Sequence, residues 1–598
     1  MRNLSLASCG VMFLAAVLII SLVGSDTLYA GDPAAGGAAP PPPEAAPPPP
    51  EAAPPPPEAA PPPPEAAPPP PEAAPPPPEA APPAPGPEMP PVEPPVEPPV
   101  KPPVEPPVNP PVEPPVEPPA PQLACVETSL GKAPEGIDYN SMAVSPDSMH
   151  VAYYFANGNK WAVSLDGKPQ KEYDGLGVNT IRFSPDSTRM GYLAVQGGKW
   201  FAVIDGQEGQ QYNMIGGRGI VFSPDSKHYA YAAQKGQDWV ICMDGAEQEP
   251  YKNVSDVNLS FSTDSSRLAY LATKTEKWLV VVDGKPGEEY NTVGNLSFVW
   301  SPDCKRYAYV AQIDDKWAVV MDGQPGTKYD AVGDKTFIWS PDSKHYAYIA
   351  QKNNLWLVVT DGAEKKGYEQ IWSNTLMFSP DSATFAYAAS LNKKCYLNTN
   401  DTEAELPYES INAMQFSPDS KTLAYCAQKG AEATLVVGDK VMGGHDGVAF
   451  GTFMFSPDSK RWACTVFKGK MLLVIVDGAP QGTHDKIGDG SIVFSPDSQR
   501  YAYLAGDGGK WFMVIDGSAE TKYFNVAGGK AVFSPDSQHI AYAASTQNNE
   551  WKIAVDDKDC KAYDGILIGA KIEFTDNTHV HTLSFRSGEF LRLEVTLP

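Results

Sequence analysis

The stretch TFIWSPDSKHYAYIAQKNNLWLVVTDG, from Thr336 to Gly362, decides the fold of this protein. It holds three short runs of β-branched, aromatic and small apolar residues, separated by the polar segments SPDS, KNN and DG. Proline presets φ for a turn, and Asp and Asn side chains bond to nearby backbone, so each separator is a turn. A further short strand follows near Tyr368. Four strands in one 39-residue unit leave no room for a helix.

The same unit recurs along the chain every 39 residues, with one step of 38 and a last step of 41. Its Ser-Pro-Asp turn, or a variant of that turn, is found twelve times. The first residue of the turn stands at Ser145, Ser184, Ser223, Ser262, Ser301, Ser340, Ser379, Ser417, Ser456, Ser495, Ser534 and Thr575. A period near 40 with four antiparallel strands per repeat is typical of a propeller blade. The sequence therefore predicts an all-β fold of twelve four-stranded blades.

Three other positions repeat in register with this turn. In repeats one to six a Trp, an Asp-Gly pair and a Tyr follow at fixed distances, as Trp356, Asp361 and Tyr368 follow Ser340. Repeats seven to nine replace the Trp by Cys395, Ala433 and Leu472. Side chains at one register meet between neighbouring blades, so packing explains these columns without a ligand.

The number of repeats and the change after Trp356 bear on how the blades close. Propellers typically have four to eight blades, so we expect two six-bladed rings in tandem, over residues 122–365 and 366–598. The last repeat lacks an outer strand, and residues 123–138 supply a spare one. We expect this spare strand to complete blade six, and the segment around Tyr368 to complete blade twelve. Pairing of the spare strand with residues 590–597 would instead indicate one large ring.

The segment FSPDSKHYAY, from Phe222 to Tyr231, resembles the WD40-like PD40 repeat of TolB-type propellers. The resemblance covers the chain after residue 122. It implies a propeller working in the periplasm and, in TolB-type proteins, binding to a peptidoglycan-associated lipoprotein. Those proteins carry a small α/β domain before a six-bladed ring, where this chain has a proline-rich segment. The Asp-Gly turn also departs from the usual pattern of the family.

Two different segments precede the repeats. Residues 1–30 read as a secretory signal peptide, because Arg2 is followed by an uncharged run from Leu4 to Gly24 and by Ala30 at a possible cleavage point. The same run is long enough for an uncleaved signal anchor. Residues 31–121 form a disordered stalk rich in Pro, Ala and Glu, in which polyproline II is the conformation left to the backbone. A semi-rigid spacer is the simpler interpretation, and a docking site for a proline-binding module is the alternative.

Composition narrows the classes of partner. A formal net charge of −26 argues against nucleic acid and against an anionic membrane surface. Contact with a membrane is expected only through the N-terminal anchor, if it stays uncleaved. Seven cysteines lie between Cys125 and Cys560 without metal-ligand spacing, and no disulfide is assigned from them.

Few residues are candidates for a metal-binding or catalytic site. The repeated Asp of Ser-Pro-Asp could form a carboxylate ring for a metal, but turn chemistry explains it more simply. His150, His228, His345 and His539 share the fifth position after the Ser, which indicates a structural role. His445-Asp446 and His484-Asp485 replace the Tyr column, either as metal ligands or as substitute aromatics. The run from Asn398 to Glu403 offers oxygen ligands for calcium but lacks the glycine and distal Glu of a known loop.

These observations predict no catalytic, cofactor-binding or metal-binding residue, and no cofactor. We expect a non-catalytic scaffold, exported to the periplasm or the cell surface and held on a proline-rich spacer, that binds a protein or another cell-envelope component. The alternative is a propeller enzyme of the lyase or lactonase kind, with its site in the funnel formed by repeats seven to twelve, where the pattern diverges.

Overall fold

A computed structural model describes residues 123–597 apart from residues 450, 520–522, 527–529, 547 and 557. The predicted signal peptide or anchor and the proline-rich stalk lie outside the described residues. Within the described residues, no helix is long and apolar enough to cross a bilayer.

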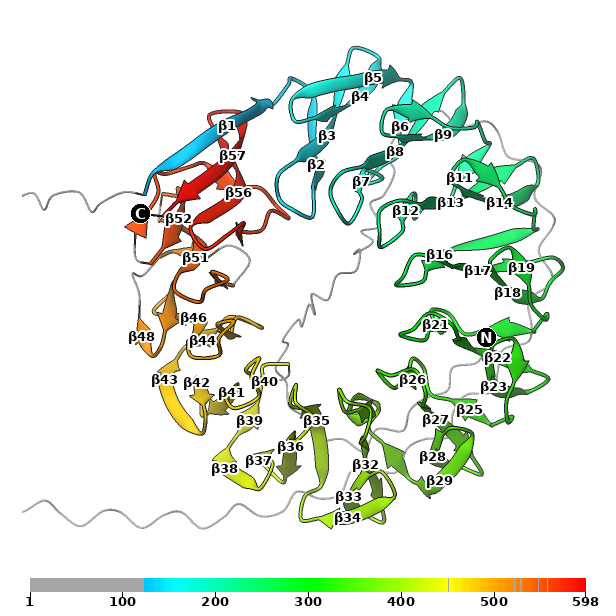
Figure 1. Cartoon of the computed structure of the whole chain (residues 1–598), viewed down its shortest axis with the longest axis vertical. Coiled ribbons are helices and arrows are strands. Elements are labelled where there is room, and N and C mark those ends of the chain that lie inside the picture. Colours follow the sequence, from blue (N-terminus) through cyan, green and yellow to red (C-terminus); the bar gives the residue numbers. More distant parts are fainter. Residues whose placement is uncertain are drawn as a thin grey trace, which may run out of the picture. The chain divides into compact units, whose positions relative to one another are not determined.

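Twelve antiparallel sheets follow one another around a single ring, as the strand pairing and Figure 1 show. The second strand of each blade is built on the segment after the Ser-Pro-Asp turn, where small and β-prone apolar residues alternate faces. These second strands are β3 (Val151–Asn157), β8 (Met190–Gln196), β13 (Tyr229–Lys235), β17 (Leu268–Thr273), β22 (Tyr307–Ile313), β27 (Tyr346–Lys352), β32 (Phe385–Leu391), β36 (Leu423–Lys429), β41 (Trp462–Lys468), β46 (Tyr501–Asp507), β51 (Ile540–Ser545) and β56 (His579–Arg586).

The third strand of blades 1 to 11 ends at the Asp-Gly turn or its replacement. These strands are β4 (Lys160–Leu165), β9 (Lys199–Ile204), β14 (Asp238–Met243), β18 (Trp278–Val282), β23 (Lys316–Met321), β28 (Leu355–Thr360), β33 (Lys394–Thr399), β37 (Glu432–Val437), β42 (Met471–Val476), β47 (Lys510–Ile515), β52 (Trp551–Val555) and β57 (Glu589–Thr596). The predicted all-β class and the twelve four-stranded blades are thus confirmed.

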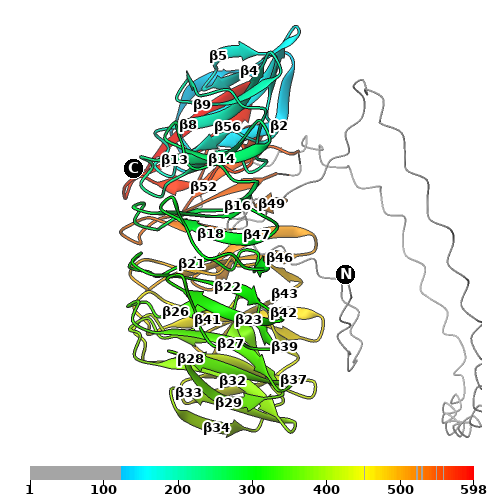
Figure 2. The same cartoon turned by 90° about the vertical axis from the view of Figure 1, so that its right-hand side faces the viewer.

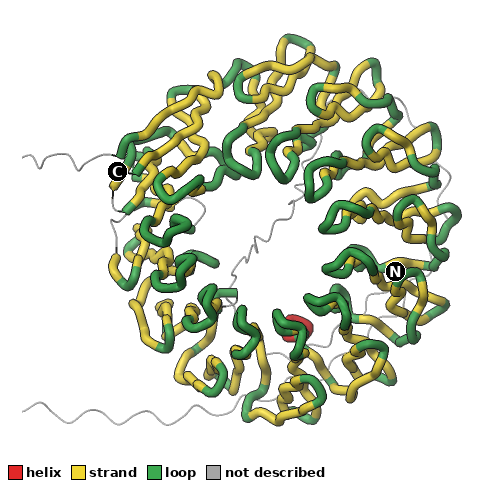
Figure 3. Tube along the Cα trace, viewed as in Figure 1, coloured by secondary structure: helices red, strands yellow, loops and turns green. Residues whose placement is uncertain are grey.

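The innermost strand is interrupted in most blades. In blade 2 it consists of β6 (Gly175–Leu176) and β7 (Arg182–Phe183), which both pair with β8 and enclose a short loop. Figure 3 shows such loops gathered at the inner edge of the blades. In blade 7 the loop contains η1 (Ser373–Thr375), a single 3-10 turn. Seen edge-on in Figure 2, the ring is one layer of blades.

The core lies between blades rather than inside any one of them. Leu193 and Ile204 of blade 2, for example, share a buried cluster with Tyr231 and Val240 of blade 3. Because each sheet buries both faces against its neighbours, much of the stabilisation of a blade comes from the junctions that it forms with the blades on either side.

The closure differs from the expected one. β1 (Cys125–Lys132) pairs antiparallel with β57, in the register Cys125↔Val595 and Ser129↔Leu591, and becomes the outer strand of blade 12. The segment around Tyr368 belongs to β29 (Ala363–Tyr368), which pairs with β28 in blade 6. The prediction of two tandem rings was therefore wrong on this point, and the expected boundary at residue 365 falls inside β29. The repeat sequence does not fix ring size, because that depends on a small rotation between neighbouring blades.

Additional bonds fasten the closing strand. A disulfide joins Cys125 of β1 to Cys560, which follows β53 (Lys558–Asp559) of blade 11. The carboxylate of Glu127 accepts two bonds of 2.7 Å from the guanidinium of Arg586 and forms an ion pair of 2.9 Å with Lys561. These contacts lie next to the hydrogen-bond ladder between β1 and β57, so the first and last strands of the ring are held together by several kinds of bond.

Candidate binding site between blades 8 and 9

The Ser-Pro-Asp turns bond to one another around the inner edge of the ring. In blade 2, the Oγ of Ser184 donates to Oδ1 of Asp186 at 2.7 Å, which shapes the turn. The amide N–H of Asp186 then donates to Oγ of Ser226 in blade 3 at 3.0 Å, and nine junctions share this bond at 2.8–3.0 Å. Between blades 12 and 1, the N–H of Lys571 donates to Oγ of Ser148 at 2.8 Å. We call this set of turns the inner girdle.

The girdle carboxylates are held in their charged form. The Ser184 hydroxyl and the Thr188 amide lower the pKa of Asp186 to about 2. The pKa of the corresponding Asp is lowered in each of the twelve repeats. Donors within and next to each turn account for these shifts, so turn chemistry explains the Asp column.

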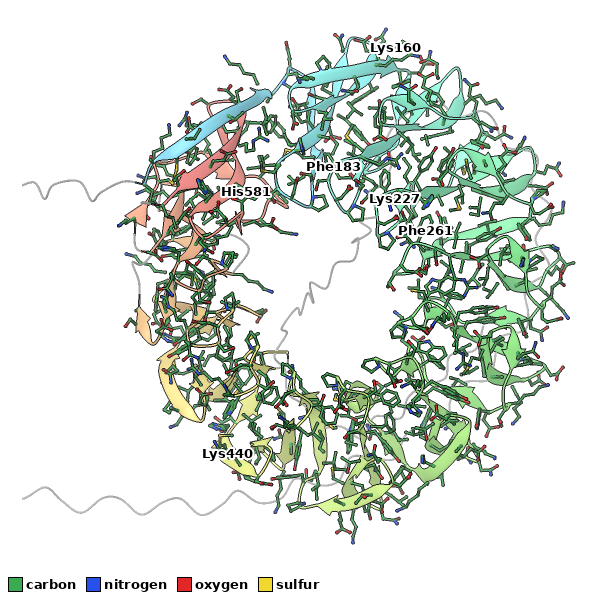
Figure 4. All side chains as sticks on the ribbon, in the orientation of Figure 1. Lys160, Phe183, Lys227, Phe261, Lys440 and His581 are labelled. Atoms are coloured by element: carbon green, nitrogen blue, oxygen red, sulfur yellow. A yellow bond between two sulfur atoms is a disulfide. The ribbon has the colours of Figure 1, made fainter. Side chains whose placement is uncertain are left out.

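The girdle surrounds a central opening. Lys227, which directly follows the turn of blade 3, lies beside this opening, whereas Lys160 and Lys440 lie at the outer edge (Figure 4). The side chains drawn in Figure 4 leave the centre of the ring open. The inner edge is therefore built largely from structural turns.

The fifth position after the Ser is occupied mainly by His or Arg, and it pairs with the Asp of the Asp-Gly turn in the same blade. His228 contacts Asp244 at 2.6 Å, and Arg189 contacts Asp205 at 2.9 Å. The longer Arg189 also donates to the carbonyl of Lys227 in the next blade at 2.8 Å. His150, His345 and His539 make the same contact with the Asp of their own blade. The structural role predicted for these four histidines is confirmed.

The two His-Asp pairs lie in different blades. His445 ends β38 (Lys440–His445) of blade 8, and His484 ends β43 (Ala479–His484) of blade 9. The ring of His484 meets that of Tyr503 edge-on at 6.0 Å, much as Tyr212 meets Tyr231 at 6.2 Å in the regular blades. His484 thus serves as a substitute aromatic, one of the two interpretations considered for it.

The run from Asn398 to Glu403 is bonded within the ring. Oδ1 of Asn398 accepts from the hydroxyl of Tyr368 at 3.0 Å, and Asp401 and Glu403 form ion pairs with Lys365 and Lys366. These oxygens hold blade 7 against blade 6. Among the described residues, no group of three or more His, Cys, Asp or Glu side chains is arranged to hold a metal ion.

A cavity of about 280 Å³ opens between the facing sheets of blades 8 and 9. Its lining includes residues of the inner loops, such as Asn374 of η1 and Ala449, as well as Gln428 of the second strand of blade 8. Blade 8 contributes β35 (Ser410–Phe416), β36 and Ala433 of β37, while blade 9 contributes β39 (Gly447–Val448) and the loop after it. The lining residues are Asn374, Asn412, Ala413, Met414, Gln415, Ala424, Tyr425, Cys426, Ala427, Gln428, Ala433, Gly447, Val448, Ala449, Gly451 and Phe453.

The cavity coincides with the loss of the Trp column. Ala433 is the smallest residue in that column, where eight repeats carry a Trp. Blade 8 also has Thr422 and Gly438 in place of the His or Arg and its Asp, so the ion pair of the regular blades is absent from it. Blade 8 thus lacks both the packed indole and the ion pair that most other blades have.

The side chains that line the cavity can contact a ligand and form hydrogen bonds with it, but they do not include a general acid, a general base or an activated nucleophile. No Asp, Glu, His or Lys is among the described residues that line it. Burial raises the pKa of the Cys426 thiol to about 12, so this thiol stays protonated at neutral pH and is a poor nucleophile. Apolar walls with a few amide side chains are typical of a binding pocket.

Sequence reasoning did not find the pocket. It noted that repeats seven to nine diverge from the pattern, and it placed a site in the funnel formed by repeats seven to twelve only under the alternative of a propeller enzyme, without naming lining residues. The signal that could have found the pocket is Ala433 itself, because an Ala in a column of indoles predicts missing volume. The Cys125–Cys560 disulfide was also missed, since its partners meet only when the ring closes.

Comparisons with known proteins add little to this picture. No protein-family model matches the sequence, and no curated protein matches it. Among solved structures, TolB from Acinetobacter baumannii is 15% identical with a TM-score of 0.22, over 42% of this chain and 77% of that chain. The β-propeller domain of Cps50 (Swd1) from Myceliophteria thermophila is 10% identical with a TM-score of 0.23, over 42% and 93%. The Dos1 propeller is 11% identical with a TM-score of 0.25, over 50% and 90%. At these scores the likenesses carry no argument about function, and the propeller fold rests on the strand pairing.

Proposed function

We propose that this protein is an exported, non-catalytic propeller scaffold, held on a proline-rich spacer, that binds a protein or another cell-envelope component. The observation that carries the proposal is the cavity between blades 8 and 9, whose described lining combines apolar residues with amide side chains and includes no Asp, Glu, His or Lys. Such a lining favours binding over catalysis, since general acid–base and nucleophilic chemistry require titratable or activated groups.

The way the repeated polar residues are used supports the same proposal. In most repeats the Ser and Asp of the inner girdle, and the His or Arg with its Asp, bond within the ring, as Ser226 does with Asp186 and Arg189 with Asp205. Groups committed to structural bonds are not available to substrates. A rigid ring with variable loops is then best suited to recognition.

The disulfide supports export. Cys125 and Cys560 are 435 residues apart in sequence and are bonded across blades 11 and 12. Disulfides persist in oxidising compartments such as the periplasm and the cell surface and are rare in the cytosol. This agrees with a cleaved or anchoring signal sequence at residues 1–30.

A fractionation experiment on cells that express the full chain with a C-terminal tag tests the proposal. We expect the protein in the envelope or extracellular fraction, with Cys125 and Cys560 resistant to a thiol reagent until a reductant is added. Crosslinking in intact cells, followed by purification under denaturing conditions, is then expected to recover one specific envelope partner.

Two results would contradict the proposal. One is a cytosolic protein with reduced Cys125 and Cys560. The other is an exported protein that crosslinks to no specific partner and that chemically converts a small molecule in an extract of the same cells. The separated halves of the chain are unsuitable as controls, because β1 completes blade 12 and neither half contains a closed ring.

A further inference from the structure

We propose that the cavity between blades 8 and 9 binds an aromatic side chain of the partner, and specifically the indole of a tryptophan. This inference rests on the proposed function and names the chemistry by which the partner is recognised. It follows from what fills the same position at the other junctions of the ring.

At regular junctions the Trp of one blade packs against an aliphatic residue of the next. Trp356 of blade 6 shares a cluster with Ile371 of blade 7, and Trp317 of blade 5 shares one with Val332 of blade 6. The same pairing joins Trp200 to Ile215, Trp278 to Val293, and Trp511 to Val526. The surface beyond each Trp is therefore shaped to receive an indole.

At the junction of blades 8 and 9 the receiving residue is present and the indole is not. Val448 occupies the place of Ile371, eight residues before the Ser of its repeat, and it lines the cavity. Ala433 occupies the place of Trp356 and lines the same cavity. The buried cluster at this junction includes Val448 but no residue of the Trp column.

The junction of blades 6 and 7 provides an internal comparison. A cavity there is also lined by residues at the equivalent positions, including Trp356, Ile349 and Gln370, and has a volume of about 190 Å³. Its counterparts between blades 8 and 9 are Ala433, Cys426 and Gly447, and the volume is about 280 Å³. All three replacements remove bulk. An empty apolar cavity destabilises a fold in proportion to its volume, so an occupant supplied from outside restores lost packing.

The size and polar lining of the cavity favour a side chain over a free small molecule. Sites for small molecules usually measure about 300–1,000 Å³, and this one falls just below that range. The polar residues of the lining include Asn374 and Asn412, joined by a bond of 2.5 Å from Nδ2 of Asn374 to the carbonyl of Asn412. Amide groups in the lining can bond to the backbone of a bound peptide. Tryptophan is also among the residues that most often anchor protein interfaces in such pockets.

The repeat itself supplies the variant that closes the pocket. Ala433→Trp installs the residue that eight other blades carry at this position, so we expect the protein to fold with a melting temperature at or above that of the wild type. Leu472→Trp is the matched control, because it restores the same column in blade 9 and leaves the blade 8–9 cavity open. Gly447→Gln is a second closing variant, which introduces the side chain that Gln370 supplies in blade 7.

The test uses the tripeptide Gly-Trp-Gly carrying 5-fluorotryptophan, with blocked ends, and fluorine NMR on the full mature chain. We expect the fluorine line to broaden and shift with the wild type and with Leu472→Trp. Ala433→Trp and Gly447→Gln should weaken binding by about tenfold or more. A Gly-Leu-Gly tripeptide at the same concentration should not compete.

Three results would overturn the inference: no binding of the tripeptide to the wild type at millimolar concentration, equal binding to a folded Ala433→Trp protein, or binding of free 5-fluoroindole without binding of the tripeptide. Failure here is distinguishable from failure of the scaffold role. A partner that crosslinks equally to wild type and to Ala433→Trp would refute the aromatic pocket and leave the scaffold standing.

Discussion

Blades 12 and 8 differ from the regular repeat in opposite ways. Blade 12 has more stabilising contacts than a regular blade, and blade 8 has fewer. Blade 12 gains fastenings: a strand from the other end of the chain, the Cys125–Cys560 disulfide, and the ion pairs of Glu127. Blade 8 loses them, since Ala433 replaces an indole and Gly438 replaces the Asp of an ion pair. Blade 7 lacks the same Trp and ion pair, having Cys395, Thr384 and Asn400 at those positions, but Tyr408 joins the buried cluster around Cys395.

The difference between blades 12 and 8 suggests how a closed ring can contain a binding site. Each junction contributes to holding a closed ring together, so one loosened junction is tolerated when the ends are locked. Additional bonds at the closure therefore permit missing bonds at blades 8 and 9. This separation predicts distinct responses to acid, to reduction and to substitution at the two places.

Acid is expected to have the largest effect, because it acts on all twelve blades alike. The girdle carboxylates have folded-state pKa values below their usual value, so their stabilisation is present at neutral pH and is lost as the pH falls through the folded-state pKa. For Asp186, Asp264 and Asp458 that value is about 2. We expect a melting temperature that is flat from about pH 7 to pH 5 and falls steeply from about pH 4 to pH 2.

The variant Asp186→Asn provides the control for this prediction. It should melt lower than the wild type at pH 7 and show a shallower loss between pH 4 and pH 2, because one titrating group is removed. A melting temperature unchanged down to pH 2 would show that the girdle carboxylates do not stabilise the ring.

Opening the disulfide tests the closing blade. We expect Cys125→Ser to lower the free energy of unfolding by about 4 kcal/mol, since the bond closes a very long loop in the unfolded chain. Urea denaturation measures the loss, and a reductant should give the wild type the same midpoint as the variant. Cys304→Ser is the control, because it introduces the Ser that the repeat carries at that position, and it should change stability by less than about 0.5 kcal/mol. Equal midpoints for Cys125→Ser and the wild type would refute a locked closure.

Removing an indole from a regular junction tests whether blade 8 is truly exceptional. Trp356→Ala should create at blades 6 and 7 the vacancy that Ala433 leaves at blades 8 and 9. We expect a loss of about 3 kcal/mol, at the low end for Trp→Ala because Trp356 is only partly buried. Leu355→Ala, at an exposed neighbouring position, should cost less than about 0.5 kcal/mol. If the two variants unfold at the same urea concentration, the Trp column is not structural.

The smallest expected effect concerns the girdle at the two kinds of junction. Ser226→Ala removes the hydroxyl that accepts from Asp186, and Ser459→Ala removes the one that accepts from Asp419 between blades 8 and 9. Each should cost about 1 kcal/mol, the net worth of one hydrogen bond. If Ser226→Ala lowers the free energy of unfolding and Ser459→Ala does not, the hydrogen bond between the turns of blades 8 and 9 does not contribute to stability. The weaker packing of these two blades would then extend to the inner girdle.

The sequence predicted the blade but not the ring. Ser-Pro-Asp turns, Asp-Gly turns and alternating apolar runs are local signals, and they correctly gave twelve four-stranded blades. Closure depends on a long-range choice of partner for residues 123–138, and no local pattern fixes that choice. The partners of Cys125 and Glu127 become neighbours only once blades 11 and 12 are in place.

The candidate site was not predicted from the sequence. The break in the Trp column at Cys395, Ala433 and Leu472 was visible, but it was interpreted as a boundary between two rings and not as a cavity. Which of these breaks leaves a cavity depends on neighbours from other strands: Tyr408 joins the buried cluster around Cys395, and Leu472 itself packs against Ile487. Only the three-dimensional packing shows that Ala433 is left without a substitute.

Electron microscopy of the purified protein tests the central claim, a single closed ring of twelve blades, most directly. Averaged face-on views are expected to show twelve blades around one central opening, with β1 density at the outer edge of blade 12. Views showing two smaller rings of six blades joined by a linker would contradict the account, and with it the single junction on which the aromatic pocket depends.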